Sequence, residues 1–189
     1  MQPFLESEFN LDTVETGGLL MLDGITCALF TPIWGWTIDS GLFSPVPSLF
    51  IGSLCIIAGY LFLGCSSNVA MVGIGMTING IGVASYYLIT YLLMLSSSIE
   101  SGLVPDTEQT QGMLTALWFC FESLGGYFGS ACSGWAYDMM GFRNSTFVVI
   151  GTQALSMLSL FVVWLVGRKQ KRDSTRSKKY HPLPTGDTE

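Results

Sequence analysis

Two acidic residues stand inside long apolar stretches of the sequence, where a charge is costly. Asp23 lies six residues into a stretch that begins at Gly17, and Glu122 lies about ten residues into one that begins at Met113. An ionised acid at the centre of a bilayer costs about 2.5–3.5 kcal/mol on insertion scales, and an apolar environment favours the protonated form of a carboxyl group. Both residues are therefore candidates for binding a coupling proton or the ammonium group of a substrate.

Each acid also has a structural interpretation. Asp23 is close enough to the end of its stretch for water and lipid headgroups to reach it, and Glu122 would then be a protonated side chain that is hydrogen-bonded to a neighbouring helix. Polar and aromatic residues between the two acids are candidates to line a cavity, because aromatic faces attract organic cations. The alternative for the tyrosines is anchoring at the membrane interface. These candidates are Asn79, Ser85, Tyr86 and Tyr87.

The composition places these residues in a membrane. The chain is 49% hydrophobic and 12% charged, against roughly 25% charged residues in an ordinary soluble domain. No Asp, Glu, Lys, Arg or His occurs from Ser40 to Ile99, or from Asn144 to Gly167. A membrane-spanning helix needs about 20 mostly apolar residues. The sequence therefore predicts a multi-pass integral membrane protein, of the plasma membrane or of an intracellular vesicle membrane.

About five spans fit these stretches, roughly at residues 17–38, 48–65, 69–94, 113–137 and 145–167. All of them should be α-helical, because a helix satisfies its own backbone hydrogen bonds in lipid and these segments are too long for barrel strands. The fold class expected is therefore all-α. Residues 1–16 precede the spans as a loop, and residues 168–189 follow them as a polybasic, disordered tail.

The basic residues predict an orientation. Seven of the eight Lys and Arg residues lie between Arg168 and Lys179, just after the fifth span. Basic residues next to a span favour the cytoplasmic side, so the tail should be cytoplasmic and residues 1–16 extracytoplasmic. The basic run is expected either to bind anionic membrane lipid or to serve only as a topology signal.

Catalysis, cofactors and metals find little support in the sequence. The one histidine, His181, lies in the tail, and none of the five cysteines forms a C-x-x-C pair. No zinc or haem ligand set is therefore expected. No span holds paired carboxylates, and no Ser-Lys or G-x-S-x-G arrangement occurs. We expect no enzyme activity, no cofactor and no nucleic-acid partner.

Glycines are concentrated in the third and fourth spans. Small residues let helix backbones approach closely in lipid, so such a face predicts either static helix packing or a sliding interface. The fourth span holds the glycines that we expect to pack against another helix. They are Gly125, Gly126, Gly129 and Gly134.

Three stretches together resemble the C-terminal half of a major facilitator superfamily transporter. The first is "PIWGWTIDSG", in which Gly35 and Asp39 resemble the G-x-x-x-D signature at the cytoplasmic end of the eighth helix. The second, "SLGGYFGSACSGWAYDMMGF", resembles the glycine-rich eleventh helix, and the third is the basic tail. No Lys or Arg follows Asp39 directly, although the family signature usually continues with basic residues. The third span also has no carboxylate near Ala84, so monoamine exchange is not implied.

The resemblance implies that the five spans are helices eight to twelve of a twelve-helix transporter. The nearest resemblance is to the vesicular polyamine and amine transporter group. On this basis we expect the C-terminal fragment of a secondary transporter, proton-coupled and moving a small organic cation such as a polyamine. Such a transporter places its substrate between two six-helix halves, so the N-terminal half would be a required partner. The alternative is a non-transporting membrane scaffold or receptor-like protein, in which both acids are structural.

Overall fold

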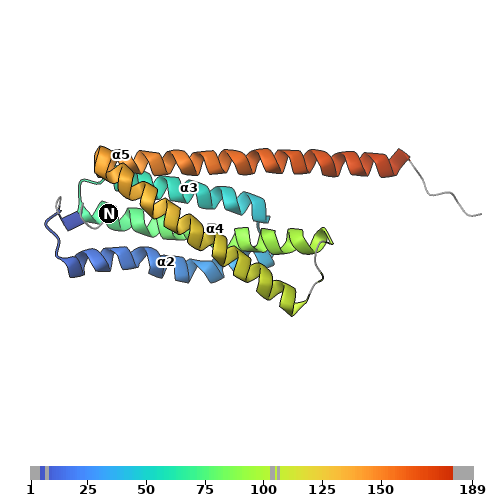
Figure 1. The fold of residues 1–189 in the computed structure, drawn as a ribbon, viewed down its shortest axis with the longest axis horizontal. Helices are drawn as coiled ribbons and strands as arrows, with labels where there is room; N and C mark the ends of the chain where they lie inside the picture. Colours follow the sequence, from blue (N-terminus) through green and yellow to red (C-terminus); the bar gives the residue numbers. More distant parts are fainter. Residues whose placement is uncertain (1–4, 7–8, 103–104, 106, 181–189) are drawn as a thin grey trace, which may run out of the picture. The chain divides into compact units, whose positions relative to one another are not determined.

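The computed structural model describes residues 5–6, 9–102, 105 and 107–180, and these residues form helices without any strand. The helices are α2 (Thr13–Asp39), α3 (Pro45–Gly64), α4 (Val69–Glu100) and α5 (Glu108–Tyr180) (Figure 1). In the described part of the chain, four helices are long and apolar enough to cross a membrane. The prediction of an all-α membrane protein is confirmed.

Local sequence signals set where α2 and α3 begin. The carboxylate of Asp12 accepts a hydrogen bond from the backbone of Thr13 at 2.8 Å, and the backbone of Asp12 donates to Glu15 at 3.2 Å. This reciprocal capping starts α2 four residues before the apolar stretch itself. In α3, Pro45 occupies the first turn, where a missing N–H costs nothing. The helix therefore begins three residues before the span that the sequence predicts from residue 48.

Small residues let α4 pack closely against both α2 and α3, between which it lies (Figure 1). A Cβ atom added at Gly82 would lie 2.6 Å from the carbonyl oxygen of Gly52 in α3. One added at Gly80 would lie 2.6 Å from the carbonyl oxygen of Asp23 in α2. Ser85 adds a hydrogen bond to the carbonyl oxygen of Ser48, at 3.1 Å. Backbone contact of this kind is the usual way in which helices associate in lipid.

Helix α5 contains two rods rather than one. Its 73 residues would extend about 110 Å if straight, far beyond the roughly 30 Å of a bilayer core. Gly141 breaks it with φ 73° and ψ 171°, a conformation that favours glycine. Figure 1 shows α5 folding back between its two rods. Helix α5 therefore covers both of the spans that the sequence predicts here, at 113–137 and 145–167.

The chain divides into two compact units, residues 1–154 and 155–189. The second unit continues α5 as helix to Tyr180. The tail that the sequence predicts from residue 168 thus begins within the helical part of this unit. Residues 181–189, including His181, lie outside the described residues, as do the side chains of the basic run.

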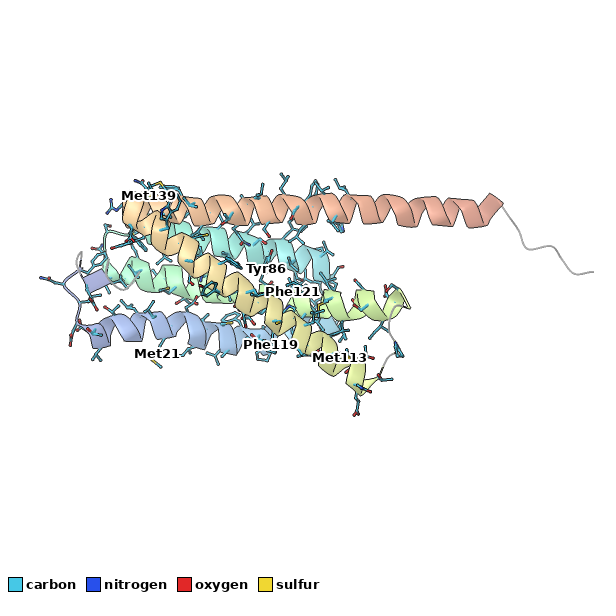
Figure 2. The ribbon with its side chains drawn as sticks, viewed as in Figure 1. Met21, Tyr86, Met113, Phe119, Phe121 and Met139 are labelled. Atoms are coloured by element: carbon cyan, nitrogen blue, oxygen red, sulfur yellow. The ribbon has the colours of Figure 1, made fainter. Side chains whose placement is uncertain are left out.

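The core of the first unit gathers at one end of the helices. Leu5 is completely buried, in a cluster with Leu63, Val72 and Met76. Part of the predicted N-terminal loop therefore packs against α3 and α4. The first rod of α5 presents large apolar side chains outward, among them Phe119 and Phe121 (Figure 2). Such a surface suits lipid or further helices.

Candidate functional site

Asp23 is paired with Asn79, across the contact of α2 with α4. The side-chain nitrogen of Asn79 donates to an oxygen of the Asp23 carboxyl group at 2.9 Å. Asn79 is only 7% exposed, and its side-chain oxygen has no hydrogen-bond partner among the described residues. A buried acceptor without a donor is costly and unusual. The side-chain oxygen of Asn79 can therefore accept one further hydrogen bond.

The backbone contacts around this pair fix its position. Gly80 follows Asn79, and the missing side chain at Gly80 allows the backbone of α2 to approach at Asp23. On the other side, a Cβ atom added at Gly59 of α3 would lie 2.9 Å from both the backbone nitrogen and the Cβ of Asn79. Asn79 is thus held between two helices, and neither a larger neighbour nor a shift of its own backbone is tolerated easily.

Glu122 meets α4 about two helical turns further along, in an aromatic cluster. The hydroxyl group of Tyr87 interacts with the carboxyl group of Glu122 and lies within electrostatic range of Asp23. The ring of Trp118 packs edge-on against Tyr87, with centroids 5.7 Å apart, and against Tyr91 at 6.0 Å. The first Lys or Arg in the sequence is Arg143. Neither acid therefore has a basic partner on α2, α3, α4 or the first rod of α5.

The other predicted cavity residues have different surroundings. Ser85 is completely buried and donates its hydroxyl hydrogen to the carbonyl oxygen of Ser48. This hydrogen bond joins α4 to α3. Tyr86 is partly buried and Tyr87 is partly exposed. Figure 2 labels Tyr86 on α4. The structure thus brings Asp23 to Asn79 and Glu122 to Tyr87, while Ser85 belongs to helix packing.

The two signature residues lie near the end of α2. A Cβ atom at Gly35 would lie 3.7 Å from a methyl carbon of Leu88, which is an ordinary contact. Asp39 is the last residue of α2 and is exposed. Trp34, beside Gly35, donates its ring N–H to the carbonyl oxygen of Ile81 at 3.2 Å. This end of α2 is therefore tied to α4.

The four glycines expected to pack in the fourth span are exposed in this structure. A Cβ atom added at any of them would meet no heavy atom within 4 Å. The close backbone contacts are made by other glycines, in α3 and α4, whose faces point at each other. Counting small residues cannot tell which helix face meets a partner. The glycines of the fourth span are Gly125, Gly126, Gly129 and Gly134.

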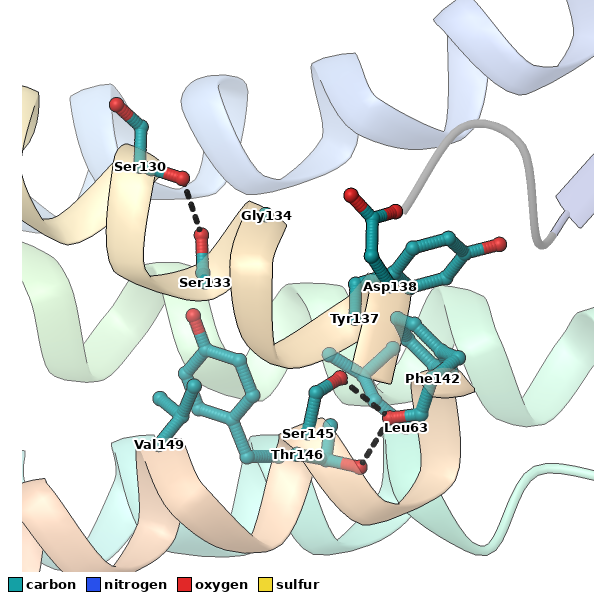
Figure 3. Close-up of a pocket in the computed structure, with 11 residues that line it drawn as sticks. Leu63, Ser130, Ser133, Gly134, Tyr137, Asp138, Phe142, Ser145, Thr146 and Val149 are labelled. Carbon is teal, nitrogen blue, oxygen red and sulfur yellow. Dashed lines mark hydrogen bonds between the residues drawn. The ribbon is translucent and has the colours of Figure 1, made fainter. Parts of the chain in front are cut away.

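Sequence reasoning missed a hollow beside the turn at Gly141. Two cavities, of about 450 and 420 Å³, lie between α3 and the two rods of α5. Hydroxyl-bearing residues on both sides of the turn line them, and the only signal in the sequence was the frequency of Ser and Thr there. Figure 3 shows the larger cavity. The residues shared by both cavities are Tyr60, Ser130, Ser133, Ser145 and Val149.

Comparison of the chain with models of known protein families returns a match. The model of the Major Facilitator Superfamily matches residues 1–187, which is nearly the entire chain. Comparisons with curated proteins and with solved structures return no match. The family match agrees with the long apolar helices and with an integral membrane protein. The chain therefore belongs to the major facilitator superfamily, whose members are membrane transporters.

Proposed function

We propose that this chain forms part of a secondary transporter that exchanges protons for a small organic cation, such as a polyamine. The observation that carries the proposal is the pairing of Asp23 with Asn79, in a chain whose first basic residue is Arg143. A carboxyl group at membrane depth without a basic partner can be neutralised by a proton or by a bound cation. Alternation between the two is what a proton/cation exchanger requires.

The amide of Asn79 offers Asp23 a way to hold a proton. A primary amide and a protonated carboxyl group can form two hydrogen bonds at once, since each has a donor and an acceptor on facing atoms. Asn79 already donates to Asp23, and its own oxygen lacks a donor. If the amide is turned over, its oxygen faces Asp23 and again needs a hydrogen from the carboxyl group. A proton on Asp23 satisfies either orientation.

Glu122 supplies a second acid on a different helix, beside aromatic rings. The hydroxyl group of Tyr87 interacts with its carboxyl group, and the ring of Trp118 packs edge-on against Tyr87, with centroids 5.7 Å apart. The negative face of an aromatic ring attracts an organic cation, by about 0.5–2 kcal/mol depending on desolvation. An acid with aromatic neighbours suits an ammonium group better than it suits an anion. Glu122 is therefore proposed to contact substrate or proton, while the substrate class itself rests on the family resemblance.

The proposal includes a second helical bundle. Substrates of such transporters bind between two repeats of the fold. Gly125, an exposed glycine of α5 that lines neither cavity, has nothing packed on it and would accept another helix closely. We assign the spans to helices eight to twelve and the partner to the N-terminal half. Sequencing of transcripts upstream of Met1 tests this assignment, and seven further spans are expected.

The transport proposal is tested in sealed membrane vesicles from cells that express the chain together with that N-terminal half. Uptake of a labelled polyamine is measured with an acidic vesicle interior. Uptake should stop when an ionophore collapses the proton gradient, and it should be lost in a double variant with Asp23→Asn and Glu122→Gln. Glu108→Gln, at an exposed acid at the start of α5, serves as the matched control and should transport normally.

Two results would contradict the proposal. Uptake that continues after the gradient is collapsed would remove proton coupling. A double variant that accumulates the polyamine like the unchanged protein would assign both acids a structural role, as in a scaffold protein. Equal surface expression of all variants, measured on the same vesicles, ensures that lost uptake reflects lost transport.

A further inference from the structure

The two cavities beside Gly141 have a lining with an unusual hydrogen-bonding character. Ser130 donates its hydroxyl hydrogen to the carbonyl oxygen of Tyr127 at 2.9 Å, and Ser133 donates to that of Ser130 at 3.0 Å. On the other rod, Ser145 donates to Phe142 at 2.8 Å (Figure 3). A hydroxyl group has one hydrogen and two lone pairs. While these hydrogen bonds are made, the three groups present lone pairs to the cavity.

The remaining lining has the same tendency. Thr146 directs its hydroxyl hydrogen at backbone carbonyl oxygens of Phe142 and Arg143, at 3.1 and 2.7 Å. Thr152, which lines the smaller cavity, donates to Val149 at 2.8 Å. Asp138 lines the larger cavity and adds a carboxylate, while no Lys, Arg or His among the residues that the structure describes lines either one. The phenol groups of Tyr60 and Tyr137 are the side chains there that still have a hydrogen to give.

We propose that the larger of the two cavities, called here the hydroxyl cavity, binds an organic ammonium ion that carries several N–H donors. Each N–H of such an ion finds an acceptor, and Asp138 balances its charge. An anion would meet a carboxylate and unpaired lone pairs. A quaternary ammonium ion would bury the acceptor oxygens without bringing a donor to any of them, which is costly.

The size and the aromatic walls of the hydroxyl cavity agree with such a guest. A volume of about 450 Å³ lies within the usual range of small-molecule sites, roughly 300–1,000 Å³. Tyr60, Tyr137 and Phe142 border it and add ring surfaces that attract cations.

This inference goes beyond the proposed function, because it concerns residues that neither acid pair uses. Binding at the hydroxyl cavity needs no proton gradient. It can therefore be measured where transport is absent, and transport can fail while binding persists. The two proposals are separated by the variants at Asp138 and at Ser130 and Ser133, which should lower binding at the hydroxyl cavity whether or not transport takes place.

The experiment uses the full chain in nanodiscs of uncharged lipid, with labelled 1,4-diaminobutane as the probe. The diamine should bind saturably, and its fully N-methylated, bis-quaternary analogue should bind at least about tenfold more weakly, since the charge-assisted hydrogen bonds are lost. Asp138→Asn should weaken diamine binding by at least about tenfold for the same reason. The double variant with Ser130→Ala and Ser133→Ala should weaken it several-fold.

Matched controls come from α2 and α4. Ser98 and Ser101 also lie three residues apart and donate to carbonyl oxygens of their own helix, but they line neither cavity. Alanine at both should leave binding unchanged, as should Asp39→Asn. Circular dichroism and gel filtration establish that each variant folds. Equal binding of the two diamines, unchanged binding in Asp138→Asn, or no saturable binding by the folded chain would each overturn the proposal.

Discussion

Helix α4 supplies a polar partner to each acid that the apolar stretches contain. Asn79 meets Asp23 and Tyr87 meets Glu122, from residues eight positions apart. The sequence predicted the acids, because a charge in an apolar stretch is visible without any structure. The sequence placed Asn79 and Tyr87 among the candidate cavity residues but did not indicate which acid each of them contacts. Asn79 and Asp23 are separated by 56 residues, so their contact depends on how α2 and α4 pack.

The first prediction at this scale concerns Asn79 as a positioning residue for the proton on Asp23. In the assembled transporter, Asn79→Leu should abolish proton-driven accumulation, because Asp23 loses both the donor and the acceptor that suit its protonated form. Exchange of labelled for unlabelled substrate without a gradient should continue. Thr77→Val, which removes a hydroxyl bonded within its own helix, is the control and should retain both activities. Equal loss of exchange and accumulation would make Asn79 a packing residue only.

The second prediction concerns Glu122. Glu122→Gln keeps the size and hydrogen-bonding capacity of the side chain but removes its ability to titrate. We expect proton-driven accumulation to be abolished, with expression and membrane insertion largely intact. Glu108→Gln, at the start of α5 and outside the aromatic cluster, is the matched control. If Glu122→Gln transports with an unchanged dependence on pH, the carboxyl group is structural.

At the scale of helices, the contact between α3 and α4 is made of backbone against backbone. Long apolar segments with few charges predicted the helices, and the structure has helices in each of these segments. The sequence could not tell which glycines make contacts. Gly73 faces leucines of α2, and Gly75 faces the backbone of α3 only two residues later. The face that a glycine occupies, and what opposes it, is set by the crossing of the helices.

The third prediction compares two glycines in this respect. Gly82→Ala should destabilise the fold by about 1–3 kcal/mol, because the added Cβ would overlap Gly52 and Ile56 of α3. Gly126→Ala adds the same atom in open space and gains the same helix propensity, so it should be neutral or slightly stabilising. Unfolding in mixed detergent micelles, followed by circular dichroism, measures both. Equal stabilities would mean that α3 and α4 do not pack closely.

At the scale of the whole molecule, the family match and the arrangement of helices agree, while the orientation stays a prediction. The turn at Gly141 reverses the chain within a segment that hydropathy alone divides into two spans. The hydroxyl cavity forms beside that turn, from residues up to about 90 positions apart in the sequence. Sequence periodicity carries no information on such distances, so the cavity could not be predicted. The basic run after the fifth span remains the basis for the orientation.

The fourth prediction tests this orientation. In a variant without native cysteines, a cysteine at Ser177 should not react with an impermeant reagent added to intact cells, and one at Ser7 should react. The seven basic residues between Arg168 and Lys179 favour the cytoplasmic side for the former. Permeabilised cells should show both positions labelled, which serves as the control. Labelling of Ser177→Cys from outside would reverse the topology.

The many acceptors that line the hydroxyl cavity also have a consequence for water. Water molecules that enter it should direct hydrogens toward Ser130, Ser133 and Ser145, because each of these hydroxyl groups donates its own hydrogen within its helix. A file of water with this fixed polarity cannot easily turn over, and proton hopping along a water wire requires each molecule to reorient after every transfer. The cavity should therefore admit ammonium ions while conducting protons poorly.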